Sequence, residues 1–567
     1  MEMRNFKKVL SVLSALIMLL YVPAGCGSAK TPVDNGSSTI PAVTTAQATA
    51  AAFDPMAKYE SPVTITVARR TQQGAKFSDG QSMDGDNIWN KLYSEYGINI
   101  KTLWSADASQ YTQKLNLSIA SEEIPDLLYV YDSQKNMMEK ANMTMDMKPY
   151  YDKYAIENTK KVYESDGGIG LKAATSDGKL LFLPTNQSDQ NSQGDLLWIR
   201  ADWLKNVGMS EPKTFDDMEK IMDAFVHNDP NKDGKGGTYA LAIAGKDNLV
   251  NDWASTCGIF QGFHVMPVLS VNNTMFFNKD SSGNITWDGT NPNTKLALQK
   301  LQDWYKKGYL SADLSTTDAG GKLVQDLTAS KFGMVYCPGW LPSWPLPDLK
   351  KKVASADWIP VSPPTIDGKT AQIFGYTTVG AWYAVSKDCK NPEAIMKMMN
   401  LYVDKAQTDP ANYSTDYVST DAGRGSYCCA AYVWDTAMGR TNYEIVSAAV
   451  KAKDSSLLKT PQQTARYDSI MKFLDDPTDI TGWSMYWFRI KAHKVLYEDM
   501  TVKNNAYIGA MTDLMASKIP TLKKMEQEVI SKIIYDKASV SDWDKMVEDW
   551  GKLGGDEILK EVAELTK

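Results

Sequence analysis

The chain has 567 residues, of which 43% are hydrophobic and 23% are charged, and its formal net charge is −7. At about 100 to 200 residues per domain, this length predicts more than one folded lobe. The acidic balance and the lack of a basic cluster exclude nucleic acid as a partner.

The N-terminus has the pattern of a lipoprotein signal peptide over residues 1–25. Basic residues precede an apolar run over 9–21, and Ala24-Gly25 stands directly before Cys26. This run is shorter than the roughly 20 residues that span a membrane. We therefore expect Cys26 to carry the lipid, although Pro23 departs from the usual aliphatic residue. An ordinary secretory signal and an uncleaved helix are the alternatives.

Residues 26–60 are rich in Ser, Thr, Ala, Pro and Gly. Such a segment has too few large apolar side chains to offset the entropy of ordering, so it predicts a flexible linker. Two acyl chains on one cysteine would hold the protein stably on a bilayer. The expected location is the cell surface, lipid-anchored to the outer face of the cytoplasmic membrane.

The folded part begins with alternating strands and helices. We expect strands at 62–67, 98–100 and 124–131, with helices at 87–93 and 111–120 between them. This β-α-β-α-β order predicts an α/β fold with an open parallel sheet. Ligands of such sheets lie beyond the carboxyl ends of the strands.

A second group of elements follows residue 177. A turn and strand cover 177–184, and a strand covers 196–200. Thr214 is a good N-cap residue for a helix, with Asp217 three positions later. Further helices are predicted at 202–206 and 294–307, and beyond Pro520.

Several blocks resemble family 1 extracellular solute-binding proteins, the lipoproteins of Gram-positive carbohydrate ABC importers. The sequence from Trp198 to Gly208, together with Pro212 to Met218, is similar to the family block IRxDWLxxxGxxxPxTxDE. Blocks in matching order are 115–127, 301–314, 521–532 and 540–555. The resemblance implies a periplasmic-binding-protein-like fold, in which two α/β lobes joined by a hinge close on a sugar in the cleft between them.

On this basis we expect the first lobe at 61–175, with a returning segment at about 315–400. The second lobe is expected at 176–314, with a returning segment at about 401–567. The implied function is capture of an oligosaccharide by a monomer and its delivery to ABC transporter permease subunits.

Two other functions are open alternatives. One is a glycan receptor or adhesin at the cell surface that does not take part in import. The other is a surface glycoside hydrolase, which needs two carboxylates at a set separation. Catalysis is the weaker of the two, because HExxH, GxSxG and P-loop motifs are absent and the three histidines are scattered. We therefore expect no enzymatic activity and no required cofactor.

One segment starts like a calcium-binding loop. Asp229, Asn231 and Asp233 occupy positions one, three and five, and the carbonyl of Lys235 is at position seven. Position twelve, where an EF-hand has a bidentate glutamate, is Ala240. A structural Ca²⁺ is one interpretation, and a plain turn is the other.

The ligand-binding candidates are aromatic and polar side chains in loops after strands. Aromatic rings pack on the apolar faces of sugars, and polar side chains bind hydroxyl groups. Prolines keep 337–345 irregular, so we expect Trp340 or Trp344 to project into a cleft. The other candidates, for which simple packing is the alternative, are Trp253, Tyr376, Trp382, Arg70, Asp84, Asp132, Asn186 and Asp189.

Tryptophans on predicted helix faces are expected to pack against the core or lie on an exposed face. They are Trp89, Trp203, Trp304, Trp543 and Trp550. The five cysteines after Cys26 lack CxxC spacing, which favours buried thiols over one incidental disulfide.

Overall fold

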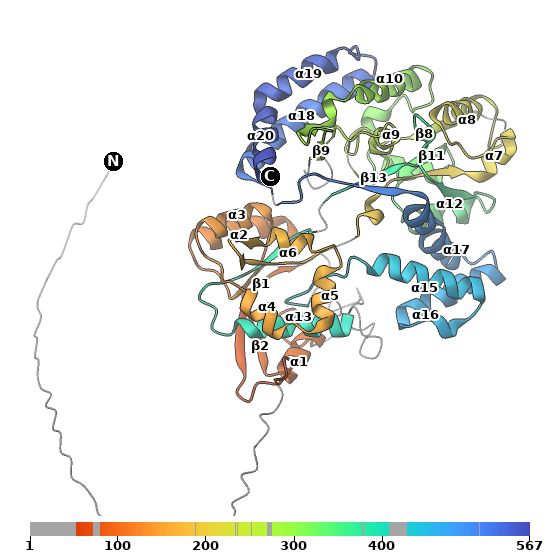
Figure 1. The fold of residues 1–567 in the computed structure, drawn as a ribbon. Helices are drawn as coiled ribbons and strands as arrows, with labels where there is room; N and C mark the ends of the chain where they lie inside the picture. Colours follow the sequence, from red (N-terminus) through yellow and green to blue (C-terminus); the bar gives the residue numbers. More distant parts are fainter. Residues whose placement is uncertain are drawn as a thin grey trace, which may run out of the picture. The chain divides into compact units, whose positions relative to one another are not determined.

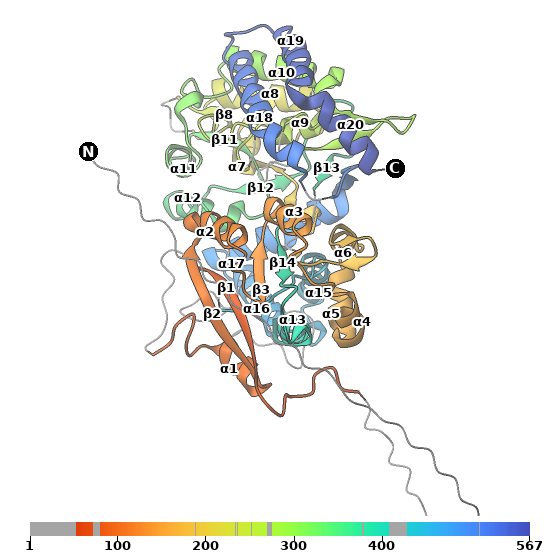
Figure 2. The same ribbon diagram turned by 90° about the vertical axis from the view of Figure 1, so that its left-hand side faces the viewer.

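A five-stranded sheet with strand order β2-β1-β3-β14-β6 organises the first lobe. β1 pairs in parallel with both β2 and β3, which confirms the predicted β-α-β-α-β start (Figure 2). β14 runs antiparallel to β3 and β6. The strands are β1 (Val63–Thr71), β2 (Ile98–Asp107), β3 (Leu127–Val130), β6 (Phe182–Pro184) and β14 (Trp382–Val385).

Helices cover this sheet, and the short hairpin of β4 (Thr175–Ser176) and β5 (Lys179–Leu180) precedes β6. Ile65 and Val67 of β1 are buried because alternate residues of the strand face the core. The helices are α1 (Ile88–Glu95), α2 (Ala108–Ala120), α3 (Asp132–Lys140), α4 (Lys148–Tyr154), α5 (Glu157–Glu164), α6 (Ile169–Ala173) and α13 (Pro392–Ala406).

This computed structural model describes residues 53–71, 80–186, 189–232, 234, 236–250, 252–268, 275–376, 379–406, 428–509 and 511–566. The chain divides into two units, Met1–Phe53 and Asp54–Lys567, and both lobes belong to the second. Cys26 lies outside the described residues. Within the described ranges, no helix is both long and apolar enough to cross a bilayer.

A four-stranded sheet with order β12-β7-β11-β8 organises the second lobe. β8 and β11 are parallel, and β7 runs antiparallel to β11 and β12. Two smaller pairs are β9 with β10 and β13 with β15. The strands are β7 (Leu196–Arg200), β8 (Tyr239–Ala242), β9 (Phe277–Lys279), β10 (Ile285–Trp287), β11 (Phe332–Cys337), β12 (Trp358–Val361), β13 (Gln372–Gly375) and β15 (Thr501–Asn504).

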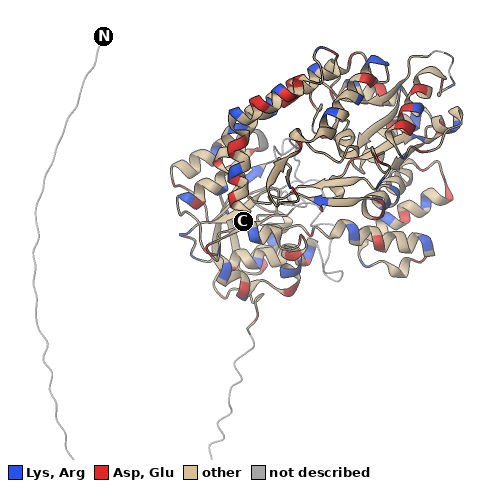
Figure 3. Ribbon diagram, turned by 45° about the horizontal axis from the view of Figure 1, so that its top comes forward, with Lys and Arg blue, Asp and Glu red and all other residues tan. Residues whose placement is uncertain are grey.

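Helix α18 packs on α10 in the second lobe (Figure 1). Figure 3 shows acidic and basic residues interspersed along the outer helices. The helices of this lobe are α7 (Ala201–Val207), α8 (Phe215–His227), α9 (Cys257–Gly262), α10 (Pro292–Lys306), α11 (Lys322–Thr328), α12 (Leu346–Lys352), α15 (Met438–Ala452), α16 (Pro461–Asp475), α17 (Ile480–Tyr486), α18 (Asp513–Ile534), α19 (Asp542–Trp550) and α20 (Asp556–Leu565).

The motif residues around Arg200 have a structural role at the junction of β7 and α7. Arg200 is 2% exposed, and its Nε and Nη2 donate to the two oxygens of Asp202 at 2.7 and 2.6 Å. The guanidinium also lies 4.6 Å from the ring centroid of Trp203. The fixed fork of arginine matches a carboxylate, so this pair fixes the angle at which the helix leaves the sheet. Thr214 and Asp217 form the expected capping box of α8.

Three described segments connect the lobes: 185–195 (without 187 and 188), 362–381 (without 377 and 378) and 428–437. They meet at Thr185, whose N–H donates to the carbonyl of Ala381 at 3.0 Å and whose carbonyl accepts from the N–H of Trp434 at 2.9 Å. Hydrogen-bonded crossing strands are therefore present, as the resemblance implies.

The strand pairing differs from the lobe boundaries expected from the sequence. β6 belongs to the first sheet although it follows residue 176, and β11 and β12 belong to the second sheet although they lie within 315–400. α13 packs on α4 and α5 of the first lobe. The difference arises because sheet membership depends on hydrogen bonds between strands distant in sequence, which a local pattern does not encode.

Both cores contain the tryptophans assigned to helix faces. Trp89, Trp203, Trp304, Trp543 and Trp550 are each at most 2% exposed. All five cysteines after Cys26 are free thiols, and four of them are buried: Cys337, Cys389, Cys428 and Cys429.

Candidate functional site

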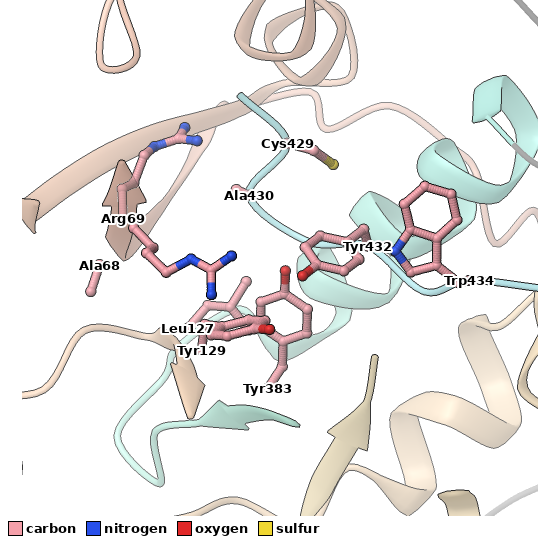
Figure 4. Close-up of a pocket in the computed structure, with 10 residues that line it drawn as sticks. Ala68, Arg69, Leu127, Tyr129, Tyr383, Cys429, Ala430, Tyr432 and Trp434 are labelled. Atoms are coloured by element: carbon pink, nitrogen blue, oxygen red, sulfur yellow. The ribbon is translucent and has the colours of Figure 1, made fainter. Parts of the chain in front are cut away.

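A pocket lined by tyrosines lies at the carboxyl ends of β1 and β3, where an open parallel sheet places its ligand site. Its volume is about 160 Å³, and the rings of Tyr129, Tyr383 and Tyr432 gather on one side (Figure 4). The centroids of Tyr129 and Tyr383 are 5.6 Å apart, and those of Tyr383 and Tyr432 are 5.7 Å apart. The ring centroid of Trp434 lies 6.4 Å from that of Tyr432. We call these four rings the tyrosine pocket.

The phenols of the tyrosine pocket stay neutral near pH 7. Burial raises the pKa of Tyr129, Tyr383 and Tyr432 above the ordinary value. The pocket therefore offers flat apolar rings with neutral hydroxyl groups at their edges, which suits a sugar ring.

Two adjacent arginines at the end of β1 have different environments. Arg69 is 4% exposed and donates to the carbonyl of Cys428, to Asn90 and to Thr102. Its Nε is also 3.8 Å from Asp84, which is itself exposed. Arg70 is exposed, lines the pocket and donates to the hydroxyl of Tyr131. Arg69 is thus a structural residue, and Arg70 is the accessible one.

Asp132, the first residue of α3, is joined to both lobes. The indole nitrogen of Trp382 donates to its Oδ1 at 2.7 Å, and the backbone N–H of Met511 donates to its Oδ2 at 3.3 Å. Trp382 is only 2% exposed. These two candidates therefore contact each other, and the buried Trp382 holds Asp132 in place rather than presenting its ring to a ligand.

Three tryptophans form a cluster at the carboxyl ends of β8 and β11 in the second lobe. The ring centroid of Trp253 lies 5.7 Å from that of Trp340 and 5.3 Å from that of Trp344. The centroids of Trp340 and Trp344 are 6.1 Å apart. Trp253 is 4% exposed, whereas Trp344 is 43% exposed. We call this the tryptophan cluster. Its buried member anchors two rings that remain accessible to a ligand.

A buried carboxyl group lies at the same edge of the second sheet. Asp195 immediately precedes β7, whose Leu196 pairs with Cys337 at the end of β11. Burial, together with the charge of Asp252, raises the pKa of Asp195 to about 7. Asp252 is exposed and its Oδ1 accepts from the N–H of Trp253 at 2.8 Å. An acidic pair therefore lies beside the tryptophan cluster.

The remaining candidates lie in the crossing segments. Asn186 is fully buried, and among the described residues neither its Oδ1 nor its Nδ2 has a hydrogen-bond partner. Asp189 accepts from the hydroxyl of Tyr497 at 2.7 Å and from the N–H of Ser192 at 2.6 Å. The carbonyl of Tyr376, which is half-buried, accepts from Gln190 at 3.1 Å. The bonds of Asp189 and Tyr376 therefore hold the crossing segments in place, whereas the side chain of Asn186 adds no hydrogen bond among the described residues.

The loop beginning at Asp229 fits a calcium ion in part. Oδ2 of Asp229 accepts from the N–H of Gly234 at 3.1 Å, as in a tight turn, and its Oδ1 is buried without a partner among the described residues. Ala240, at position twelve, is fully buried in β8 and offers no carboxylate. Asp233 and Lys235 lie outside the described residues. No cluster of three or more His, Cys, Asp or Glu residues that could hold a metal occurs in the described part of the chain.

The structure thus brings the sequence candidates into separate groups. Trp253, Trp340 and Trp344 meet in one cluster, whereas Arg70 lies in the tyrosine pocket and Asp84 lies beside Arg69. Sequence reasoning missed Tyr129, Tyr383, Tyr432, Trp434 and Asp195. Tyr129 lies in a strand without polar alternation, which indicated burial on both faces. Recurrent tyrosines on adjacent strand segments were the signal that could have found this pocket.

Comparison with known proteins agrees with this architecture. The family model described as bacterial extracellular solute-binding protein matches residues 87–420. The fructooligosaccharide ABC transporter substrate-binding protein FusA of Streptococcus pneumoniae is 24% identical over 343 residues, which cover 58% of this chain and 59% of FusA. The lipoprotein LipO of Bacillus subtilis is 22% identical over 476 residues, which cover 83% of this chain and 86% of LipO.

Solved structures share the fold. An HMO-binding, ABC-transporter-associated solute-binding protein of Bifidobacterium longum infantis superposes with a TM-score of 0.62 at 14% identity, over 89% of this chain and 98% of that one. An EF-hand mutant of FusA in complex with fructo-nystose has a TM-score of 0.58 at 16% identity, over 89% of this chain and 99% of that one.

These likenesses confirm the predicted fold of two α/β lobes of the periplasmic-binding-protein type. They also confirm the family resemblance that the sequence blocks indicated, since the family model covers more than half of the chain. This chain is a member of the bacterial extracellular solute-binding protein family.

Proposed function

We propose that the protein captures an oligosaccharide in the cleft between its lobes and delivers it to the permease of an ABC transporter. The observation that carries this proposal is that each lobe places accessible aromatic rings at the carboxyl ends of its parallel strands. The tyrosine pocket does so in the first lobe and the tryptophan cluster in the second. Rings with polar groups at their edges match the two kinds of surface that a sugar presents.

The names of the relatives support the same class of ligand. FusA is named for fructooligosaccharides, and the Bifidobacterium protein for HMO binding. A sugar that contacts both the tyrosine pocket and the tryptophan cluster would favour the closed arrangement of the lobes, because only that arrangement lets the two sites contact it together. The crossing strands that meet at Thr185 would act as the hinge. In this proposal the first lobe comprises about 54–184 and 382–406, and the second about 196–361 and 438–566.

The anchor and the metal belong to the same proposal. Cys26 would carry the lipid that holds the protein at the outer face of the cytoplasmic membrane, as the name of the lipoprotein LipO also suggests. The unpartnered oxygen of Asp229 supports a structural calcium ion in the loop that follows, with waters completing its shell in place of a carboxylate at Ala240. The protein would act as a monomer and would release its sugar chemically unaltered.

A panel of oligosaccharides tests the proposal. Isothermal titration calorimetry on the mature protein should find at least one saccharide that binds, and small-angle scattering should show a more compact particle with that saccharide. Chromatography of the sugar after prolonged incubation should recover it intact. Shortened products would instead identify a glycoside hydrolase.

Uptake measurements separate import from adhesion. Cells that lack the protein should lose uptake of the bound sugar and regain it when the protein is restored. Normal uptake in the deleted strain would favour the surface receptor or adhesin.

A further inference from the structure

The tyrosine pocket contains a positive charge that no acidic group in the described ranges neutralises. Arg70 forms one hydrogen bond there, from Nη1 to the hydroxyl of Tyr131 at 2.9 Å, and its guanidinium carbon lies 5.6 Å from the ring centroid of Tyr129. An arginine has five N–H donors. Most of the donors of Arg70 are therefore available to a ligand.

The groups that act electrostatically on Arg70 include the phenols of Tyr131, Tyr129, Tyr432 and Tyr111. The phenols of Tyr129 and Tyr432 are neutral because burial raises their pKa, so they do not offset its charge. The adjacent Arg69 gives an internal contrast. It is buried, has three hydrogen-bond acceptors and lies 3.8 Å from a carboxylate oxygen of Asp84.

An accessible guanidinium beside flat aromatic rings has a defined ligand chemistry. Its planar fork binds a carboxylate through two parallel hydrogen bonds, and the neighbouring rings can pack against the sugar that bears the carboxylate. The chain as a whole has a net charge of −7, which repels anions, so an anionic sugar would need such a local cation. A neutral sugar would leave this cation without a counter-charge.

We propose that Arg70 recognises the carboxylate of an acidic sugar, so that the tyrosine pocket selects a uronic-acid unit of the oligosaccharide. This inference rests on the proposed function, because it names the substrate class of the same cleft. It makes Arg70 a specificity-determining residue, and it assigns Tyr131 the role of orienting its guanidinium.

Matched ligands test the charge alone. We would titrate the protein with trigalacturonate, trimannuronate and a glucuronate-substituted xylotriose, each paired with its methyl ester, which keeps the sugar and removes the charge. We expect at least one acid to bind tenfold or more tightly than its ester, and its affinity to fall as sodium chloride is raised. Equal affinity for acid and ester in all three pairs, or binding of none of the six, would overturn the inference.

Variants assign the preference to Arg70. Arg70→Gln should bring acid and ester to the same affinity, and Arg70→Lys should keep part of the preference because it retains the charge without the fork. Lys58→Gln is the matched control, since Lys58 lies 5.3 Å from the ring centroid of Tyr96, outside the pocket, and its removal changes the net charge equally. Loss of the preference in Lys58→Gln as well, or its retention in Arg70→Gln, would contradict the assignment. Melting curves of the free variants would show that all are folded.

The same titrations distinguish failure of the Arg70 assignment from failure of the proposed function. Kestose and other neutral oligosaccharides form a further arm of the same titrations. Binding of a neutral sugar without any preference for acids would refute only the role of Arg70, whereas no binding of any saccharide would refute sugar capture itself.

Discussion

The indole nitrogen of Trp382 donates a hydrogen bond to Oδ1 of Asp132 at 2.7 Å, which joins the start of β14 to the start of α3. The other oxygen of Asp132 accepts from the backbone of Met511, in the segment that precedes α18 of the second lobe. One carboxylate therefore ties a buried aromatic residue of the first sheet to a chain segment of the other lobe.

A double-mutant cycle measures this bond. Trp382→Phe and Asp132→Asn should each lower the free energy of unfolding by about 1 to 3 kcal/mol, because each weakens a partly buried hydrogen bond to a carboxylate. The coupling energy from urea unfolding of the single and double variants should be about 1 kcal/mol or more. Strictly additive losses would show that the two side chains do not interact in solution.

Substitutions in the tryptophan cluster should affect ligand affinity at its accessible rings and protein stability at its buried ring. Trp344→Ala or Trp340→Ala should weaken the affinity for the bound oligosaccharide at least tenfold while the melting temperature of the free protein stays nearly unchanged, because both rings are at least partly exposed. Trp253→Ala should instead destabilise the fold by about 3 to 5 kcal/mol, since this ring is 4% exposed. Calorimetry and thermal melting provide the two readouts. Normal affinity in both Trp344→Ala and Trp340→Ala would remove the cluster from the ligand site.

Glu526 should make stability depend on pH. This side chain is 1% exposed in α18, and burial raises its pKa to about 8 although the indole of Trp550 donates to it at 3.1 Å. Between its ordinary pKa of about 4.3 and 8, the folded protein holds a proton that the unfolded chain has lost. The contribution of Glu526 to stability is therefore full below pH 4.3 and falls as the pH rises to 8.

Glu526→Gln tests this dependence in the same helix. Urea unfolding should be measured at several pH values between about 4.3 and 8. Relative to the wild type, the free energy of unfolding of the variant should rise by up to about 1.4 kcal/mol per pH unit. Glu528→Gln, at an exposed position of α18, should follow the wild-type curve. A Glu526→Gln curve parallel to that of the wild type throughout would contradict the raised pKa.

Calcium should stabilise the protein through Asp229. After treatment with a chelator, millimolar calcium should release heat in a titration and raise the melting temperature, and Asp229→Asn should abolish both effects. Asp280→Asn is the control, because Asp280 also accepts backbone hydrogen bonds in a tight loop, from Ser282 and Asn284. Absence of heat with the wild-type protein would leave the loop as a plain turn.

The proposed lobe boundaries and the proposed ligand site depend on contacts between distant residues. β14 joins the first sheet about 250 residues after β3, and Trp382 meets Asp132 only because the two strands pair. In the tyrosine pocket the rings of Tyr129 and Tyr432 likewise lie close together. Hydrophobic spacing along the chain does not predict a contact between residues so far apart in sequence.

The sequence by itself determined the local elements, because hydrophobic periodicity and capping residues act within a few positions. The strand at 196–200 and the cap at Thr214 follow from it directly. It also placed Trp253, Trp340 and Trp344 in loops. Only the tertiary structure decided that these three rings meet, that Arg69 is buried and Arg70 accessible, and which strands share a sheet. Those outcomes depend on strand pairing and burial across hundreds of residues, and pairing energies are nearly the same for many alternative registers until the whole core is formed.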